Sequence, residues 1–111
     1  TIYGDGSQTR SFMYIDDLVD ALIMLMNTPE SVTGPINIGN PEEYTIIDLA
    51  KKIVALTGSK SEIIYKAATV DDPKQRKPDM EVARKILPKW TPKVNIDDGL
   101  TKTIEYFKQQ L

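Results

Sequence analysis

The 111-residue sequence contains no cysteine and no histidine. Without cysteine the chain has no disulfide, no thiolate nucleophile and no cysteine-ligated metal site, which fits a reducing compartment, and we expect a cytoplasmic protein. Without histidine it lacks the most common general base and the favourite transition-metal ligand. Any chemistry must therefore use other side chains, and we predict no metal site.

Excess charge and long apolar runs are also missing. The 14 basic and 16 acidic residues give a net charge of −2, so no basic field would attract nucleic acid. The longest apolar run, from Ala21 to Met26, is far shorter than the roughly 20 residues that span a bilayer, and no signal-peptide pattern heads the chain. We expect a soluble protein, one domain in size, that binds neither nucleic acid nor membrane.

What is present is an alternation of short β-forming runs and amphipathic helical patterns, which predicts an α/β fold. Extended segments are expected over residues 1–3, 9–14, 35–39, 62–66 and 92–96. Helices are expected from about residue 16 to 28, from 46 to 57, from 79 to 87 and from 96 to the end, with Thr45 and Asn95 at two of their starts and Gly58 at one end. The first helix carries apolar residues nearly all round, so we expect it to be buried on most sides.

Two signatures of nucleotide-binding enzymes fail. The dinucleotide fingerprint needs three glycines at fixed offsets, whereas Gly4 and Gly6 are followed by Thr9. A tyrosine followed four positions later by lysine, the catalytic pair of short-chain dehydrogenases, occurs nowhere in the chain. The sequence therefore predicts no catalytic residue among these 111.

The arginines suggest anion binding. Only three of the 14 basic residues are arginine, and two of them, Arg10 and Arg76, lie in predicted loop or edge segments. Because a guanidinium binds two phosphate oxygens at once, this pair could clamp a diphosphate while a nearby carboxylate accepts hydrogen bonds from ribose. The alternative is that Arg10 pairs with Asp16 or Asp17 and that Arg76 is a solvated loop charge.

Three acidic pairs could suggest a cation site or an acid–base couple: Asp16-Asp17, Asp71-Asp72 and Asp97-Asp98. The first and third stand at predicted helix starts, where carboxylates offset the helix dipole and satisfy free amides, and this structural interpretation is favoured. The pair at 71 and 72 has no such explanation.

Four stretches, residues 2–19, 37–43, 71–79 and 99–107, resemble in order the carboxyl-terminal half of the extended short-chain dehydrogenase/reductase family of nucleotide-sugar enzymes, also called the NAD-dependent epimerase/dehydratase family. The resemblance is strongest to its UDP-glucuronate decarboxylases. It implies that residues 1–111 form a substrate-binding subdomain of a Rossmann-type enzyme, and that an amino-terminal half outside these residues holds NAD. The stretch Leu87 to Trp90 departs from the family's usual Leu-Gly-Trp.

The resemblance also implies a substrate-binding set: Tyr3 beside the nucleotide, Gln8, Thr9 and Arg10 lining the site, and Arg76 and Asp79 serving diphosphate and ribose. The implied parent is a homodimer that converts UDP-glucuronate to UDP-xylose and carbon dioxide, and the 111 residues alone are expected to be inactive. A 4-epimerase or 4,6-dehydratase of the same superfamily, or a binding module without catalysis, remain the alternatives.

Overall fold

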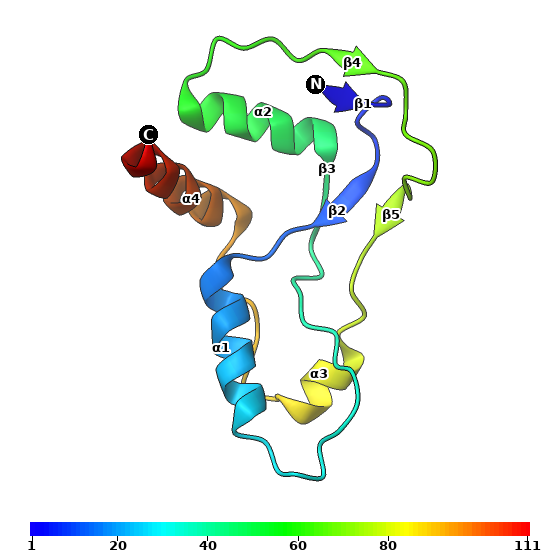
Figure 1. Cartoon of the computed structure of the whole chain (residues 1–111), viewed down its shortest axis with the longest axis vertical. Coiled ribbons are helices and arrows are strands. Elements are labelled where there is room, and N and C mark those ends of the chain that lie inside the picture. Colours follow the sequence, from blue (N-terminus) through cyan, green and yellow to red (C-terminus); the bar gives the residue numbers. More distant parts are fainter.

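The computed structural model describes residues 1–111 as an elongated α/β unit, 51 × 35 × 19 Å in extent (Figure 1). The α/β prediction is confirmed. The elements, in chain order, are β1 (Ile2–Tyr3), β2 (Thr9–Ser11), α1 (Ile15–Met26), β3 (Glu43–Thr45), α2 (Ile46–Thr57), β4 (Tyr65–Lys66), β5 (Gln75–Arg76), α3 (Glu81–Ile86) and α4 (Ile96–Gln110). None of the four helices is long and apolar enough to cross a membrane.

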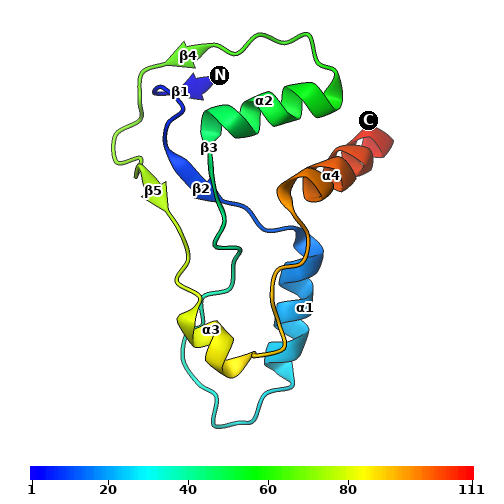
Figure 2. The same ribbon diagram turned by 180° about the vertical axis from the view of Figure 1, so that it is seen from behind.

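The strands form two small sheets. One joins β1 and β4 in parallel, with Ile2 opposite Tyr65. The other has the order β3-β2-β5, in which β2 is antiparallel to β3 and parallel to β5. Seen from either side, β2 and β3 join an upper part, with α2, α4 and the first sheet, to a lower part with α1 and α3 (Figures 1 and 2).

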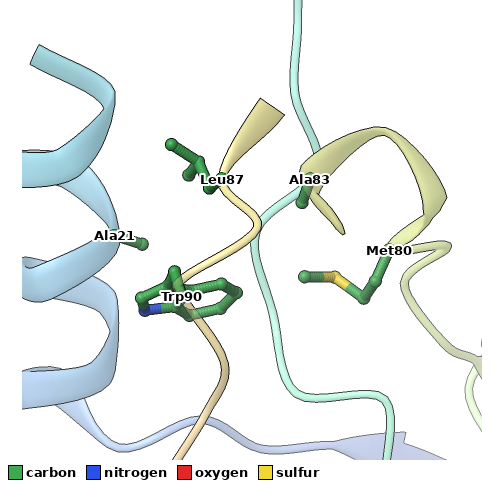
Figure 3. Close-up of a cluster of buried hydrophobic side chains, with 5 residues drawn as sticks. All are labelled: Ala21, Met80, Ala83, Leu87 and Trp90. Carbon is green, nitrogen blue, oxygen red and sulfur yellow. The ribbon is translucent and has the colours of Figure 1, made fainter. Parts of the chain in front are cut away.

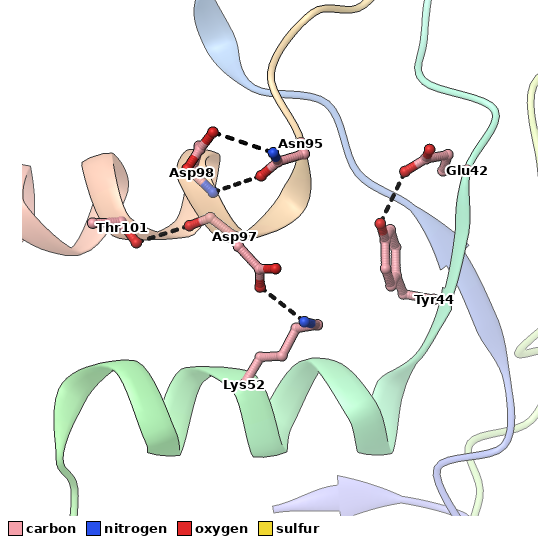
Figure 4. Close-up of polar contacts among 7 residues, drawn as sticks. All are labelled: Glu42, Tyr44, Lys52, Asn95, Asp97, Asp98 and Thr101. Carbon is pink, nitrogen blue, oxygen red and sulfur yellow. Dashed lines mark hydrogen bonds and ion pairs between the residues drawn. The ribbon is translucent and has the colours of Figure 1, made fainter.

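The predicted helix boundaries are confirmed where a side chain caps the backbone. The Thr45 hydroxyl accepts a hydrogen bond from the Asp48 amide at 3.2 Å, and the Asn95 side chain accepts one from the Asp98 amide at 2.9 Å. Gly58 ends α2 in the left-handed conformation with φ of 64°. Figure 4 shows α4 beginning beside α2, where Lys52 and Asp97 form an ion pair of 2.8 Å.

The core is small and lies between α1 and α3 (Figure 3). It consists of Ala21 from α1 together with Met80, Ala83, Leu87 and Trp90, all of which are buried. The expectation that Trp90 covers the core is confirmed. Burying an indole requires a partner for its N–H, and the Trp90 Nε1 donates to the Asp17 carbonyl at 3.0 Å.

The expected strand over residues 35–39 is wrong, because no neighbouring strand pairs with this segment. Ile36 and Ile38 nevertheless pack against the core cluster while Asn37 between them is exposed. The alternating pattern correctly indicated an extended segment with one buried side. Burial alone is not enough for a strand, which also requires a hydrogen-bonding partner.

The expectation that the first helix is buried on most sides is also wrong for this chain. In α1 only Asp17 and Ala21 are buried, whereas Leu22, Ile23 and Met26 are 47%, 53% and 84% exposed. The reason is that the core cluster covers a single side of the helix. An apolar pattern around a helix predicts that something covers it, but not which part of a protein does so.

Candidate substrate site

Arg10 and Arg76 are register partners on adjacent strands. Arg10 lies at the centre of β2 and Arg76 ends β5, and the parallel pairing sets their Cα atoms opposite each other. Neighbouring strands lie about 4.8 Å apart and side chains of opposed residues leave the sheet on the same face. Although Arg10 and Arg76 are 66 positions apart in the sequence, their side chains therefore leave the backbone at neighbouring points on one face of the sheet.

The other face of the same strands fixes this register. The Gln75 side-chain amide donates to Glu43 Oε1 at 2.6 Å, and the Thr9 hydroxyl donates to the same oxygen at 3.3 Å. The Thr9 amide also donates to the Lys74 carbonyl at 2.7 Å, just before β5 begins. One carboxylate on β3 thus holds the two strands that carry the arginines.

Arg10 is paired with Asp72, so the alternative pairing with Asp16 or Asp17 is wrong. The guanidinium Nη2 contacts Asp72 Oδ1, and Nη1 donates to the Thr9 carbonyl at 2.7 Å. The Gln8 side-chain amide lies 3.5 Å from the other Asp72 oxygen. Asp72 belongs to the acidic pair that had no structural explanation in the sequence, and this contact supplies one.

Asp17 has a role that sequence spacing did not indicate. It stands in the first turn of α1, as expected, but its buried carboxylate accepts hydrogen bonds from the backbone amides of Lys93 and Val94 at 3.1 and 3.0 Å. It therefore connects the start of α1 to the segment before α4. No local pattern reveals a contact between positions 76 residues apart.

The remaining expected site residues differ in how they are connected to Arg10 and Arg76. Tyr3 ends β1 and is 48% exposed, and its carbonyl accepts a hydrogen bond from Gln8 Nε2 at 3.0 Å. Asp79 follows Arg76 by three residues and is exposed, and its Oδ1 accepts from the Glu81 amide at 3.0 Å, at the start of α3. Gln8 thus contacts the Tyr3 backbone and is linked to Arg10 through Asp72, whereas Asp79 is near Arg76 in the chain without a hydrogen bond to it.

The glycine-rich segment Gly4 to Gly6 is a turn between two strands. It links β1 to β2, both glycines have positive φ, and the Asp5 carboxylate accepts from the Ser7 hydroxyl and amide at 2.6 and 2.9 Å. These two hydrogen bonds lower the pKa of the Asp5 carboxyl below its ordinary value. A dinucleotide site would need this turn to lead into a helix, so the residues present do not form an NAD cradle.

Tyr44 is a polar residue near the site that sequence reasoning missed. It is the β3 register partner of Arg10, and its hydroxyl donates to Glu42 Oε2 at 2.9 Å (Figure 4). Burial, followed by the hydrogen bond to Glu42, raises the pKa of the Tyr44 phenol above its ordinary value. In the structure the Tyr44 hydroxyl acts as a hydrogen-bond donor to Glu42.

Two hollows in the surface are lined by residues other than the arginine pair. One of about 280 Å³ lies near Arg84 and Trp90, and one of about 510 Å³ lies between the start of α1 and α4. Neither is lined by Arg10 or Arg76. The arginine pair is an open surface feature of this unit, with Arg76 exposed and the Arg10 side chain 20% exposed.

Residues 1–39 match the model of the NAD dependent epimerase/dehydratase family. All 111 residues align at 47% identity with UDP-glucuronic acid decarboxylase 1 of Danio rerio, covering 26% of that protein, and at 46% with UDP-glucuronic acid decarboxylase 3 of Arabidopsis thaliana, covering 32% of it. The chain thus spans between a quarter and a third of the curated relatives it matches.

Solved structures of UDP-sugar 4-epimerases superpose on nearly the whole chain. A UDP-glucose 4-epimerase from Thermotoga maritima, in complex with UDP-glucose, matches with a TM-score of 0.88 at 33% identity over 98% of this chain and 34% of its own. A UDP-glucuronic acid 4-epimerase from Bacillus cereus, in complex with UDP-glucuronic acid and NAD, matches with a TM-score of 0.88 at 32% identity. The match covers 99% of this chain and 35% of the epimerase chain. Over its full length the chain is similar to UDP-glucuronic acid decarboxylases, and over residues 1–39 it is similar to the NAD dependent epimerase/dehydratase family.

Proposed function

We propose that residues 1–111 form the nucleotide-sugar-binding unit of an NAD-dependent UDP-glucuronate decarboxylase, a cytoplasmic and homodimeric enzyme that converts UDP-glucuronate to UDP-xylose and carbon dioxide. The observation that carries this proposal is the register pairing of Arg10 with Arg76. It is supported by the identity of 40–47% to decarboxylases along the entire chain.

In this proposal the two guanidinium groups bind the diphosphate of UDP. Each planar fork can donate two hydrogen bonds to phosphate oxygens, and a diphosphate offers enough oxygens for both. Like charges opposed on one sheet face repel each other, and an anion between them removes that repulsion. A diphosphate therefore suits this pair better than a single carboxylate or a neutral sugar does.

Asp79 and Tyr3 are proposed to bind the nucleoside. One oxygen of the Asp79 carboxylate accepts a hydrogen bond from the Glu81 amide. The remaining lone pairs can accept hydrogen bonds from ribose hydroxyls. The exposed Tyr3 ring offers a face for the base. Gln8 and Thr9, which lie between Tyr3 and Arg10 in the sequence, are proposed to line the site.

The hydride chemistry is proposed to lie outside these residues. NAD, when bound, supplies reversible oxidation of a sugar hydroxyl. The glycine turn here leads into a strand, and the chain has no tyrosine–lysine pair, so we place the cofactor and the catalytic base in another part of the protein. The contribution of these 111 residues is to hold and orient the substrate.

A 4-epimerase is the second candidate function, because the solved structures that superpose on the chain include UDP-sugar 4-epimerases at 32–33% identity. A 4,6-dehydratase would use the same binding unit. The three activities differ in what happens to the sugar, which the residues of this unit do not decide.

Product analysis distinguishes these functions. Incubating the intact protein with UDP-glucuronate and NAD should release carbon dioxide and form UDP-xylose, whereas an epimerase would form UDP-galacturonate without gas release. The double variant Arg10→Met/Arg76→Met should raise KM for UDP-glucuronate much more than it lowers kcat, because binding and not chemistry is lost. Turnover by the isolated 111-residue chain would contradict the proposal.

A further inference from the structure

We propose that Asp72 is a positioning residue of the same site: its carboxylate holds the Arg10 guanidinium in the orientation that binds the diphosphate. This inference rests on the proposed function. It starts from the ion pair between Arg10 Nη2 and Asp72 Oδ1, supported by Gln8 at the second carboxylate oxygen. Both partners of Asp72 belong to the proposed substrate site.

The local sequence places Asp72 with little freedom. Asp71 adopts positive φ, 65°, and is the one residue other than glycine to do so in this chain. Aspartate tolerates this conformation better than most residues. Pro73 follows directly and restricts Asp72 to extended backbone. The hydrogen bond from the Thr9 amide to the Lys74 carbonyl then fastens the segment beside β2.

The contacts leave Arg10 able to bind an anion. A guanidinium has five N–H donors, and here one is used on the Thr9 carbonyl and one on Asp72. The remaining three make no hydrogen bond within the chain and are available to phosphate oxygens. A long side chain held in this way loses less conformational entropy on binding than a free one.

The Asp72 carboxylate neutralises one member of the arginine pair, since its ion pair is with Arg10. Arg76 forms no ion pair of its own, so pairing of Arg10 with Asp72 reduces the net positive charge of the two arginines while the site is empty. The opposite role, in which Asp72 competes with phosphate for Arg10, predicts the reverse result when Asp72 is removed. The direction of the change in UDP affinity when Asp72 is removed therefore distinguishes the two roles.

The test compares Asp72→Asn with Asp71→Asn in the intact protein by titration calorimetry with UDP and with uridine. Both changes remove one negative charge, at neighbouring positions, and asparagine accepts the positive φ at position 71 as aspartate does. An ion pair of this exposure is worth up to about a fivefold change in affinity, so Asp72→Asn should weaken UDP binding about three- to fivefold. Asp71→Asn should change it less than Asp72→Asn does, and uridine affinity should not change in either variant.

Asp72→Ala and Asp72→Glu complete the series. The alanine variant should lose at least as much UDP affinity as the asparagine variant, whereas glutamate, which restores a carboxylate, should recover part of it. Tighter UDP binding in Asp72→Ala, or an equal loss for UDP and uridine, would overturn the proposal, because the first indicates competition and the second a general structural defect.

Arg10→Ala separates this inference from the proposed function. If Arg10→Ala leaves UDP affinity unchanged, the assignment of the diphosphate site itself is wrong. If Arg10→Ala weakens binding while Asp72→Ala does not, only the role of Asp72 is wrong. In an Arg10→Ala background, Asp72→Ala should have no further effect, because the residue through which it acts is gone.

Discussion

Arg10 and Arg76 stand opposite each other on parallel strands, joined by the backbone ladder of β2 and β5. Two like charges in this arrangement oppose folding, because cross-strand pairs of equal sign are destabilising. Binding sites often keep such unfavourable arrangements for the sake of a ligand. The same relationship therefore has consequences for stability as well as for affinity.

Arg76→Gln is expected to stabilise the ligand-free protein slightly while weakening UDP binding. Removing the repulsion should raise the free energy of unfolding by about 0.5 kcal/mol or less at low salt. The gain should shrink in about 0.5 M salt, where exposed charges are screened. Urea unfolding at both ionic strengths measures it, with Arg84→Gln, which removes an exposed arginine on α3, as the control. Destabilisation by Arg76→Gln would show that the arginines do not repel each other in the fold.

Asp17→Ala is expected to destabilise the protein by about 3 kcal/mol, because two part-buried amides, those of Lys93 and Val94, lose their acceptor. Asp16→Ala, at an exposed position in the same helical turn, should cost less than about 0.5 kcal/mol. Trp90 is the only tryptophan and hydrogen-bonds to the Asp17 carbonyl, so its fluorescence reports the unfolding of this region. Equal midpoints for the two variants would contradict the role given to Asp17.

Gly6→Ala is expected to cost considerably more than Gly58→Ala. Both glycines have positive φ, 79° and 64°, so both changes carry the conformational cost, about 1 kcal/mol. At Gly6 the added Cβ would also lie 2.9 Å from the Ile47 Cβ, whereas at Gly58 nothing lies within 4 Å. We expect a total of about 3 kcal/mol for Gly6→Ala. Denaturant unfolding of the two variants gives the comparison, and equal losses would show that the approach to Ile47 is not tight.

Ser7→Ala is expected to raise the pKa of the Asp5 carboxyl toward its ordinary value, because the hydroxyl that stabilises the carboxylate is lost. The sign of the linked stability follows. A lowered pKa in the folded state gives stability that is present above the ordinary pKa and is lost as the pH falls through the folded value. NMR titration of the Asp5 carboxyl carbon measures the shift in both proteins. An unchanged pKa in Ser7→Ala would leave the amide as the sole cause.

The sequence predicted most reliably what depends on neighbouring residues. Thr45, Gly58 and Asn95 each begin or end a helix as expected, because capping is decided within one turn. The strand expected over residues 35–39 failed because pairing depends on a partner elsewhere in the chain. The prediction that α1 is buried on most sides failed for the same reason, since an apolar pattern indicates burial without indicating which segment covers the helix.

The candidate site was predictable in part. The residue type of Arg10 and Arg76 indicated diphosphate binding, and the structure brings their strands together. Asp72 could not be assigned, because its ion pair joins positions 62 residues apart and an acidic pair in a loop has many explanations. One signal was present in retrospect: an aspartate fixed by a following proline has few conformations, which is what a positioning residue needs.

A crystal structure of the intact protein with UDP would show directly whether the two arginines bind the diphosphate. We expect guanidinium nitrogens of both Arg10 and Arg76 about 2.7–2.9 Å from oxygens of the diphosphate, with Asp72 still paired with Arg10. A diphosphate bound away from β2 and β5, or held by one arginine while the other remains in solvent, would contradict it.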